Sequence, residues 1–362
     1  MRLRAGLAVT LVLLGGCTPK THPTTTGRPS PAARTTFVSE RDNFGGRFGR
    51  SYVAVTDVTS GRVVKLLVRL PYRKQTYLGS AITRAGTIWL SFGSGPLCSS
   101  GVAGCGPRPH TCSSEVLTIA PDGARRTLLR GGNDLARSAV EPSPDGHRVA
   151  FLEGSCARSY FNMHVRVLDL RTKRSFTIGA SLPPCHSLSD PTWTADGSHL
   201  IVAYGEATGD PGPDPGAGIC TEPKPSGVAV VPATHPQPGI SGATARSDAG
   251  CTIEDAVATA DGLAAFEECG KHFLDGPAVL VRYTSDVRAL SRTTIDRCVN
   301  GPEMKADASG RRLLIATYGF CNGEDPRTKV FTVDGATVKQ LHFSDPPLYP
   351  NEGELQVSGI AW

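Results

Sequence analysis

The sequence predicts an all-β protein: a six-bladed β-propeller whose blades are four-stranded antiparallel sheets. Three observations favour this fold. A strand–turn–strand motif recurs five times, a second alternating hairpin also recurs five times, and each end of the chain holds only part of one further unit. The 41 glycines and 28 prolines indicate many turns, and a hydrophobic content of 39% is typical of a soluble globular protein.

The first motif is a strand-like lead-in, a tight turn that contains glycine, and an apolar strand. Glycine in such a turn supplies the positive φ that hairpin turns require. The five turns fall at residues 83–86, 143–146, 194–197, 259–262 and 307–310.

The second motif is a hairpin of two strands with period-two alternation, which is typical of half-buried antiparallel strands. Its copies span residues 52–67, 116–129, 165–178, 278–291 and 329–342. Two hairpins for each unit give four strands, and units of this size repeated along a chain predict propeller blades.

The two ends of the chain complete each other. The C-terminal stretch "LQVSGIAW" ends at Trp362, which matches Trp193 immediately before a turn, so the last unit stops where its own turn should begin. Residues 35–39 and the hairpin 52–67 supply the missing strands. We therefore expect the C-terminal strand to pair with the N-terminal strands in one shared blade, which closes the ring and removes free sheet edges.

The turn–strand "SPDGHRVAF" (143–151) and the hairpin "YVAVTDVTSG" (52–61) resemble the TolB-like and WD40-like propeller repeats. This resemblance covers residues 35–362 and implies the fold rather than an activity. The repeats are also similar to the propeller cap of prolyl-oligopeptidase-type enzymes. Those enzymes need a further hydrolase domain, and the blades use the whole chain, which argues against that interpretation.

The N-terminus predicts export. Arg2 and Arg4 precede a short apolar segment, and Leu14-Gly15-Gly16-Cys17 resembles a bacterial lipobox, which implies lipidation of Cys17. An ordinary secretory signal with a chance cysteine is the alternative. We expect a lipoprotein signal peptide at 1–16, a disordered Thr/Pro-rich tether at 17–34 and the propeller at 35–362, with the chain anchored by lipid on the extracytoplasmic face of a cell membrane.

Eleven cysteines in an exported chain predict disulfides, with ten remaining once Cys17 is assigned to lipid. Positions equidistant from a hairpin turn face each other across antiparallel strands, which favours Cys251–Cys269, Cys298–Cys321 and, more loosely, Cys185–Cys220. The partners of Cys98, Cys105, Cys112 and Cys156 stay unassigned. A rival scheme joins successive blades as Cys156–Cys185, Cys220–Cys251 and Cys269–Cys298. All ten cysteines are expected at one end of the blades. That face is a candidate binding surface, and stability alone outside the cell is the alternative role of its disulfides.

No catalytic, cofactor or metal motif is present in the sequence. Asp210 and Asp214 could contact calcium but fit a solvated loop better. Glu267 and Glu268 are adjacent on a strand and are expected to point to opposite sheet faces, so they do not form a hydrolytic pair.

The aromatic and histidine residues are expected to be structural. Trp89 and Trp193 are expected in the core. Three histidines near the cysteine-bearing loops are expected to be surface residues: His110, His186 and His272.

Two functions remain open. The first is a binding or scaffold protein for an envelope protein, peptide or glycan, held at the membrane by its lipid. The second is a propeller-type hydrolase or lyase that acts on an envelope glycan. Carboxylates clustered at the ring axis with shifted pKa values would favour the second, and a featureless channel the first. A net charge of +5 without a dense basic tract indicates no nucleic-acid partner.

Overall fold

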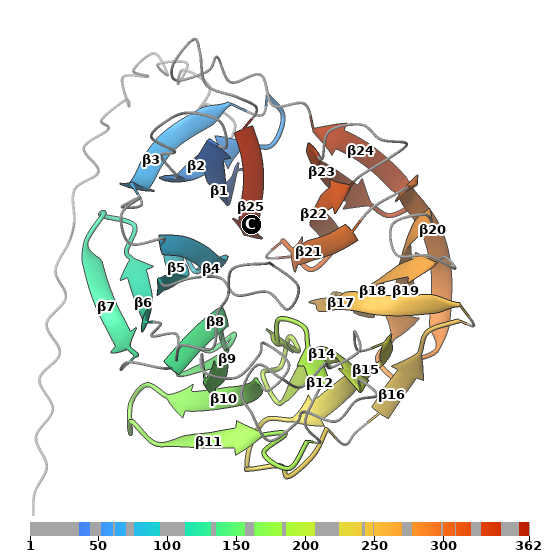
Figure 1. The fold of residues 1–362 in the computed structure, drawn as a ribbon, viewed down its shortest axis with the longest axis horizontal. Coiled ribbons are helices and arrows are strands. Elements are labelled where there is room, and N and C mark those ends of the chain that lie inside the picture. Colours follow the sequence, from blue (N-terminus) through green and yellow to red (C-terminus); the bar gives the residue numbers. More distant parts are fainter. Residues whose placement is uncertain are drawn as a thin grey trace, which may run out of the picture. The chain divides into compact units, whose positions relative to one another are not determined.

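In the computed structural model the described strands form six separate antiparallel sheets arranged as a ring (Figure 1), which confirms the six-bladed β-propeller. All of these sheets belong to one compact unit, Thr35–Trp362. The structure describes residues 36–43, 52–60, 62–69, 76–94, 113–131, 135–155, 163–182, 186–206, 224–240, 243–248, 250–269, 277–297, 300–307, 309–319, 327–341 and 355–361.

The blades are numbered in chain order, and their strands run from the ring axis outward. Blade 1 contains β25 (Leu355–Ala361), β1 (Thr36–Asn43), β2 (Tyr52–Asp57) and β3 (Val63–Arg69). Blade 2 contains β4 (Thr76–Arg84), β5 (Thr87–Ser94), β6 (Ser113–Ile119) and β7 (Arg125–Arg130). Blade 3 contains β8 (Leu135–Pro142), β9 (Arg148–Ser155), β10 (His164–Asp169) and β11 (Ser175–Ile178).

The second half of the ring follows the same order. Blade 4 contains β12 (His186–Leu188), β13 (Thr192–Trp193), β14 (His199–Glu206), β15 (Lys224–Pro232) and β16 (Ala243–Arg246). Blade 5 contains β17 (Cys251–Thr259), β18 (Gly262–Cys269), β19 (Pro277–Thr284) and β20 (Ala289–Arg297). Blade 6 contains β21 (Asn300–Ala306), β22 (Arg312–Gly319), β23 (Arg327–Asp334) and β24 (Thr337–Leu341). In blade 4 the innermost strand is split, because β12 and β13 both pair with β14.

The ring closes by pairing of the last strand with the first. β25 runs antiparallel to β1, with Val38 opposite Ala361 and Asn43 opposite Leu355. This confirms the expected shared blade, in which one strand comes from the C-terminus and three come from the N-terminus. Trp362 itself lies outside the described residues.

Successive strands alternate in direction, so the turns between the first and second strands and those between the third and fourth lie at one end of the ring. We call this end the turn face. Glycines at the predicted turns have positive φ, for example 69° at Gly146, 68° at Gly197 and 67° at Gly310. In two of these turns a hydroxyl at the first position accepts a hydrogen bond from a backbone N–H five residues on: Ser143 from Arg148 and Thr194 from His199.

The hydrophobic core consists of six layers, and each layer lies between two neighbouring blades. Trp193 of blade 4 is buried against Leu152 and Val167 of blade 3, and its Nε1 donates a hydrogen bond to the backbone oxygen of Glu141 at 2.9 Å. The guanidinium of Arg148 lies 4.7 Å from the Trp193 ring. Trp89 is also buried, so both tryptophans belong to the core as predicted.

A disulfide joins Cys251 and Cys269, which are direct partners in the register of β17 and β18. This is the pairing that their distances from the turn predict. The other predicted disulfide cysteines lie outside the described residues: Cys98, Cys105, Cys112, Cys156, Cys185, Cys220, Cys298 and Cys321. Cys17 also lies outside them. Within the described residues no helix is long and apolar enough to cross a membrane.

We predict that removal of the Cys251–Cys269 disulfide lowers the unfolding free energy by about 3 kcal/mol, because the bond closes a loop with a sequence separation of 18 residues. Thermal unfolding of Cys251→Ser/Cys269→Ser would measure this loss. A midpoint equal to that of the parent chain would contradict the prediction.

We also predict that Gly262→Ala is far more destabilising than Gly146→Ala. Both glycines have positive φ, but a Cβ at Gly262 would lie 2.3 Å from the backbone oxygen of Tyr283, whereas at Gly146 it would meet nothing within 4 Å. The control should cost about 1 kcal/mol, and the test variant several times more. Urea unfolding of the two variants in parallel provides the comparison, and equal losses would refute it.

Candidate functional site

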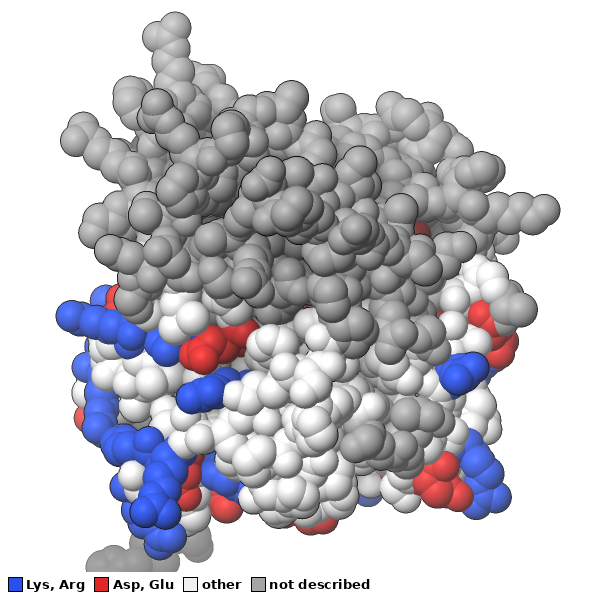
Figure 2. All heavy atoms as spheres, turned by 60° about the horizontal axis from the view of Figure 1, so that its bottom comes forward, with Lys and Arg blue, Asp and Glu red and all other residues white. Residues whose placement is uncertain are grey.

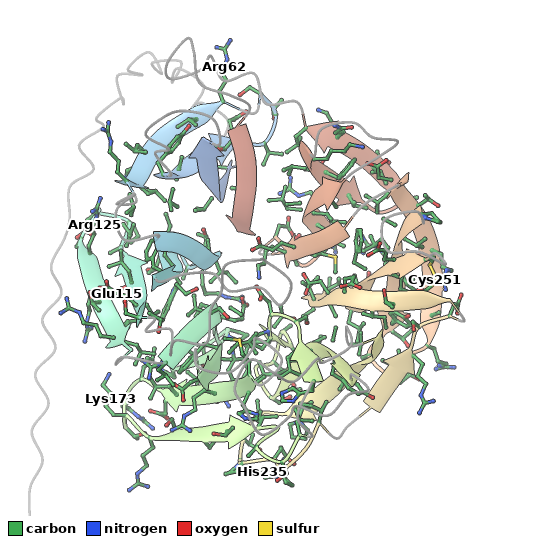
Figure 3. All side chains as sticks on the ribbon, in the orientation of Figure 1. Arg62, Glu115, Arg125, Lys173, His235 and Cys251 are labelled. Atoms are coloured by element: carbon green, nitrogen blue, oxygen red, sulfur yellow. A yellow bond between two sulfur atoms is a disulfide. The ribbon has the colours of Figure 1, made fainter. Side chains whose placement is uncertain are left out.

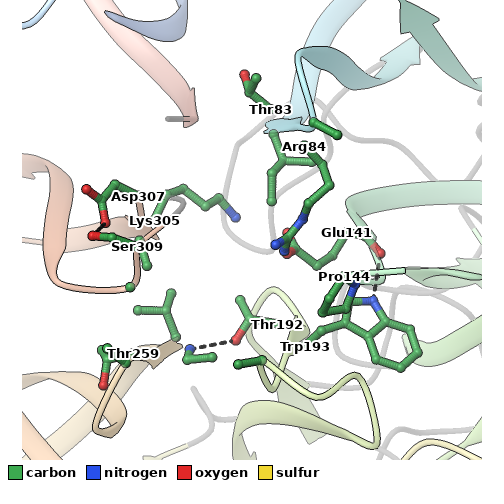
Figure 4. A pocket seen from close by; sticks show the side chains of 18 residues that line it. Thr83, Arg84, Glu141, Pro144, Thr192, Trp193, Thr259, Lys305, Asp307 and Ser309 are labelled. Atoms are coloured by element: carbon green, nitrogen blue, oxygen red, sulfur yellow. Dashed lines mark hydrogen bonds and ion pairs between the residues drawn. The ribbon is translucent and has the colours of Figure 1, made fainter. Parts of the chain in front are cut away.

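A cavity of about 150 Å³ lies at the ring axis and is lined in part by the turns of the turn face (Figure 4). Blades 2 to 6 all contribute to it. Each provides residues from the C-terminal end of its innermost strand, from the turn that follows, or from both. The charged side chains that line it are Arg84, Glu141, Lys305 and Asp307, together with the hydroxyls of Thr83, Thr192, Thr259 and Ser309. The cavity therefore lies at the opposite end of blade 5 from the Cys251–Cys269 disulfide, which joins the start of β17 to the end of β18.

Lys305 on β21 is a buried cation whose ammonium group points into this space (Figure 4). Its Nζ lies 2.6 Å from Oδ2 of Asp190, so the ion pair joins blades 6 and 4 across the axis. Burial opposes the charge, but the carboxylates of Asp190, Glu303 and Asp255 outweigh it and raise the pKa of Lys305. Its neighbouring carboxylates therefore favour the protonated, charged form of Lys305.

Glu141 on β8 is a buried carboxyl beside a second cation. Burial raises its pKa to about 7, against the opposing effects of Lys305 and Arg84. Its Oε1 accepts a hydrogen bond from Nη2 of Arg84 at 3.3 Å, which joins blades 3 and 2. Near neutral pH, both protonation states of Glu141 are populated, which suits a group that exchanges a proton with a ligand.

Asp255 on β17 is a second buried carboxyl, and burial raises its pKa well above the usual range. It does not line the cavity. Its two oxygens accept hydrogen bonds from the backbone N–H groups of Ala256 (2.8 Å) and Met304 (2.7 Å), so it ties blade 5 to blade 6. Its role is to position β21, and hence Lys305, rather than to contact a ligand.

The remaining acid in the lining, Asp307, is engaged by its own turn. Burial alone would raise its pKa, but hydrogen bonds from Ser309 and Arg312 lower it below the usual value. Its oxygens also accept backbone N–H groups of Arg311 and Arg312. Glu141 is thus the carboxyl of the lining whose surroundings leave it able to take up or release a proton near pH 7.

The cations have hydrogen-bonding capacity to spare. An ammonium group has three donors, and among the described residues Lys305 uses one of them on Asp190. Within the same part of the chain, Nε of Arg84 is buried and has no acceptor. Two cationic groups with unused donors and a carboxyl that is readily protonated make a site for a small anion.

The sequence-predicted candidates lie elsewhere or outside the described part of the chain. Asp210, Asp214, His110 and His272 are not described. His186, expected at the surface, is instead buried on β12, and its Nε2 lies 2.7 Å from the backbone oxygen of Met163. The His186 ring can lie in the core because its Nε2 is within hydrogen-bond distance of this backbone oxygen.

Glu267 and Glu268 are both buried near the end of β18. Glu267 is buried in blade 5, where Tyr283 donates a hydrogen bond to its Oε1 at 3.1 Å and Arg292 lies 2.5 Å from its Oε2. Burial raises its pKa, although Arg292 and Tyr283 oppose the shift. One carboxylate oxygen also lies within 4.8 Å of the Cys251 and Cys269 sulfurs, but these sulfurs are joined in the disulfide.

The axial charges were not identified from the sequence, although the repeat contains a signal for them. In the aligned motifs Glu141 and Lys305 stand two residues before the turn, where the other copies have Ala81, Thr192 and Val257. Asp190 and Asp255 stand four residues before it. The signal is the recurrence of charged residues at these two positions of the motif, which comparison of the repeats could have found.

No protein-family model matches the chain, and no curated protein matches it. Among solved structures, it is similar to the β-propeller domain of the Trilobed protease from Pyrococcus furiosus, with 13% identity, a TM-score of 0.38, and coverage of 73% of this chain and 71% of that one. It is also similar to an oligogalacturonate lyase in complex with manganese, with 12% identity, a TM-score of 0.42, and coverage of 84% and 72%.

A further match is a puromycin-hydrolyzing peptidase from Mycobacterium tuberculosis, with 14% identity and a TM-score of 0.45. The match covers 86% of this chain but 46% of that peptidase, so this chain spans about half the length of that protein. At these TM-scores the likenesses carry no argument about the activity of the axial site, which depends on its own residues.

We predict that Glu141→Gln changes the pH dependence of stability. The folded state binds the Glu141 proton more tightly, because burial raises the pKa from 4.5 to about 7. The stability that Glu141 contributes to the folded state is therefore lost as pH rises from about 4.5 to about 7, by up to about 3 kcal/mol. Glutamine does not ionise, so the Glu141→Gln variant does not lose this stability. The unfolding free energy of the variant minus that of the parent should therefore be larger at about pH 8 than at about pH 5.

Urea unfolding at both pH values tests this. Asp196→Asn serves as a control without pH dependence in this range, since hydrogen bonds from Ser198 and Thr194 lower the pKa of Asp196 to about 2. Its carboxyl is ionised in the folded and unfolded states at both pH values, so the difference between that variant and the parent should be the same at about pH 5 and at about pH 8. A difference between Glu141→Gln and the parent that does not vary with pH would contradict the prediction.

Proposed function

We propose that this protein is an extracytoplasmic binding protein, anchored to a cell membrane through lipid on Cys17, whose axial cavity receives a carboxylate-bearing group of an envelope peptide or glycan. The observation that carries the proposal is the pair of cations in the cavity. Lys305 and Arg84 come from different blades, and their charged ends point into one small space (Figure 4).

The charge balance of the site supports an anionic ligand. Asp190 compensates Lys305, and Glu141 compensates Arg84 only in its ionised form. When Glu141 is protonated, the lining has an excess of positive charge that a ligand carboxylate can neutralise. The protonated Glu141 can also donate a hydrogen bond to that carboxylate, so binding is coupled to proton uptake and weakens as pH rises above about 7.

The proposed location is supported by the N-terminal sequence and by the cysteine content. A charged n-region, a short apolar segment and a cysteine after two glycines are the features of a lipoprotein signal. The Cys251–Cys269 disulfide fits an oxidising compartment outside the cytoplasm. A rigid ring that holds preformed donors at its axis suits recognition, because few groups need to be ordered when the ligand binds.

A second candidate function is a lyase that uses Glu141 as the general base. The pKa of about 7 favours it, since a base works best when its pKa lies near the operating pH. Lys305 and Arg84 would neutralise the substrate carboxylate. Ionised Glu141 would take the proton from the adjacent carbon, a carbon–carbon double bond would form, and the C–O bond at the next carbon would break with its electron pair leaving on oxygen.

Hydrolysis of a glycan is less well supported than elimination. Glycosidases need two carboxyl groups on either side of the scissile bond. In the described lining the second acid is Asp307, and its oxygens are already occupied by Ser309, Arg311 and Arg312.

We predict that the cavity binds D-glucuronate and discriminates against D-glucose, which has a neutral hydroxymethyl group in place of the carboxylate. Arg84→Met should weaken glucuronate binding about tenfold or more, because a hydrogen bond between charged groups is lost. Lys329→Met is the matched control, since it removes a 2.6 Å ion pair with Asp296 on the outer strands. Titration followed by NMR measures the affinities. Equal affinity for the two sugars, or equal losses in the two variants, would contradict the proposal.

The lyase candidate has its own test on an oligouronide. The new double bond, conjugated with the carboxylate, absorbs in the ultraviolet, so turnover can be followed directly. Glu141→Gln should retain glucuronate binding and abolish this signal if the protein is a lyase. If the parent chain binds the oligouronide but the ultraviolet absorbance does not change, the lyase candidate is excluded and the binding function is retained.

A further inference from the structure

The outer strands and outer turns of blades 1 to 3 carry an arc of exposed cations, which we call the basic rim. The basic rim comprises seven residues: Arg62, Lys65, Arg69, Arg126, Arg171, Lys173 and Arg174. No carboxylate of a described side chain lies within 4 Å of the charged nitrogens of these seven residues. Figure 3 shows Arg62 and Lys173 at the outer edge of the ring, with Arg125 between them, and in Figure 2 Lys and Arg side chains gather on one side of the described surface.

In the other half of the ring, exposed cations form ion pairs with acidic residues. On the outer hairpins of blades 5 and 6, the pairs are Arg288 with Asp286, Arg292 with Asp248, and Lys329 with Asp296. Among the described side chains of blades 4 to 6, two exposed cations of the outer hairpins have no carboxylate within 4 Å: Arg246 and Lys339. The uncompensated charge is therefore concentrated on blades 1 to 3.

Blade 1 adds apolar surface to this charge. On β3, Val64 is 48% exposed and Leu66 is 43% exposed, on either side of exposed Lys65. Apolar side chains interleaved with cations suit the boundary between lipid headgroups and acyl chains, where charge attracts anionic lipid and apolar groups enter the interface. A purely polyanionic partner would gain nothing from Val64 and Leu66.

The course of the chain places this surface near the expected anchor. Thr36 at the start of β1 is opposite Asp57, whose backbone N–H donates to the oxygen of Arg62 at 2.9 Å. Thr36, where the described chain begins, thus lies beside the turn that contains Arg62 of the basic rim. The proposed lipid on Cys17 is separated from Thr36 by 18 residues in the sequence, so it would keep blade 1 within at most about 65 Å of a bilayer.

We propose that the basic rim, together with Val64 and Leu66, docks the propeller on an anionic phospholipid surface. Blade 1 provides the apolar contact, and blades 2 and 3 extend the electrostatic contact along the arc. This docking surface is distinct from the axial site, and contact along it fixes the orientation of the ring at the membrane.

The test uses residues 17–362 with Cys17→Ser, so that neither the signal peptide nor the lipid contributes. This chain keeps the ring, since every described strand finds its partners within residues 36–361. We expect it to sediment with vesicles of phosphatidylglycerol and phosphatidylcholine but not with phosphatidylcholine alone. Lys65→Gln/Arg126→Gln/Arg174→Gln should lower the partition constant on the order of 100-fold, because each Lys or Arg near an anionic surface contributes about a factor of five.

A matched control variant removes the same charge from the other half of the ring: Arg246→Gln/Arg311→Gln/Lys339→Gln. We expect this control to bind vesicles like the parent chain, and Arg84→Met in the axial cavity to do the same. Equal losses in the two triple variants would show non-specific attraction of a cationic protein and would overturn the proposal.

A second pair of variants separates a membrane from a soluble polyanion. Leu66→Ser should weaken binding to the anionic vesicles but not to polyglutamate, whereas Leu290→Ser, which removes a leucine of 57% exposure on β20, should change neither. If Leu66→Ser binds vesicles like the parent, or if the parent binds polyglutamate but not vesicles, the partner is not a lipid surface.

Discussion

Burial of apolar surface between neighbouring blades is the constraint on which the whole structure depends. Each of the six core layers is shared by two blades, so a blade has no complete core of its own. Removing a blade would expose two layers at once, and an open ring would leave one layer uncovered. The β25–β1 pairing completes blade 1, which shares one layer with blade 2 and another with blade 6.

The same constraint creates the axial site. Closing the ring brings the first strands of all six blades together around one axis, and five of them contribute to the cavity. Charged groups buried at such a place are costly unless they are paired, and removing one partner leaves an uncompensated charge. Lys305 is held by Asp190, and β21 is held by Asp255, so the ammonium group is fixed before any ligand arrives. Glu141 is the adaptable member, because its charge can change near neutral pH.

Much of the fold could be predicted because its determinants are local. Period-two alternation and glycine-containing turns gave the hairpins, and equal distance from the turn identified Cys251 and Cys269 as partners. The split inner strand of blade 4 was not foreseen, because two short strands separated by Ser189, Asp190 and Pro191 have no distinct pattern. The axial site was missed for a different reason. Lys305 and Asp190 are 115 residues apart, and whether two inner strands meet across an axis depends on ring closure rather than on spacing.

The shared blade also sets the order in which the protein can fold as it is made. Blades 2 to 6 each consist of consecutive strands and can assemble as their residues emerge, whereas blade 1 must wait for Leu355–Ala361. Until then β1 keeps a free edge that can accept the same strand from a second copy, which is the usual route to a swapped dimer. The last residues of the chain thus decide whether the first ones join their own ring or that of a neighbour.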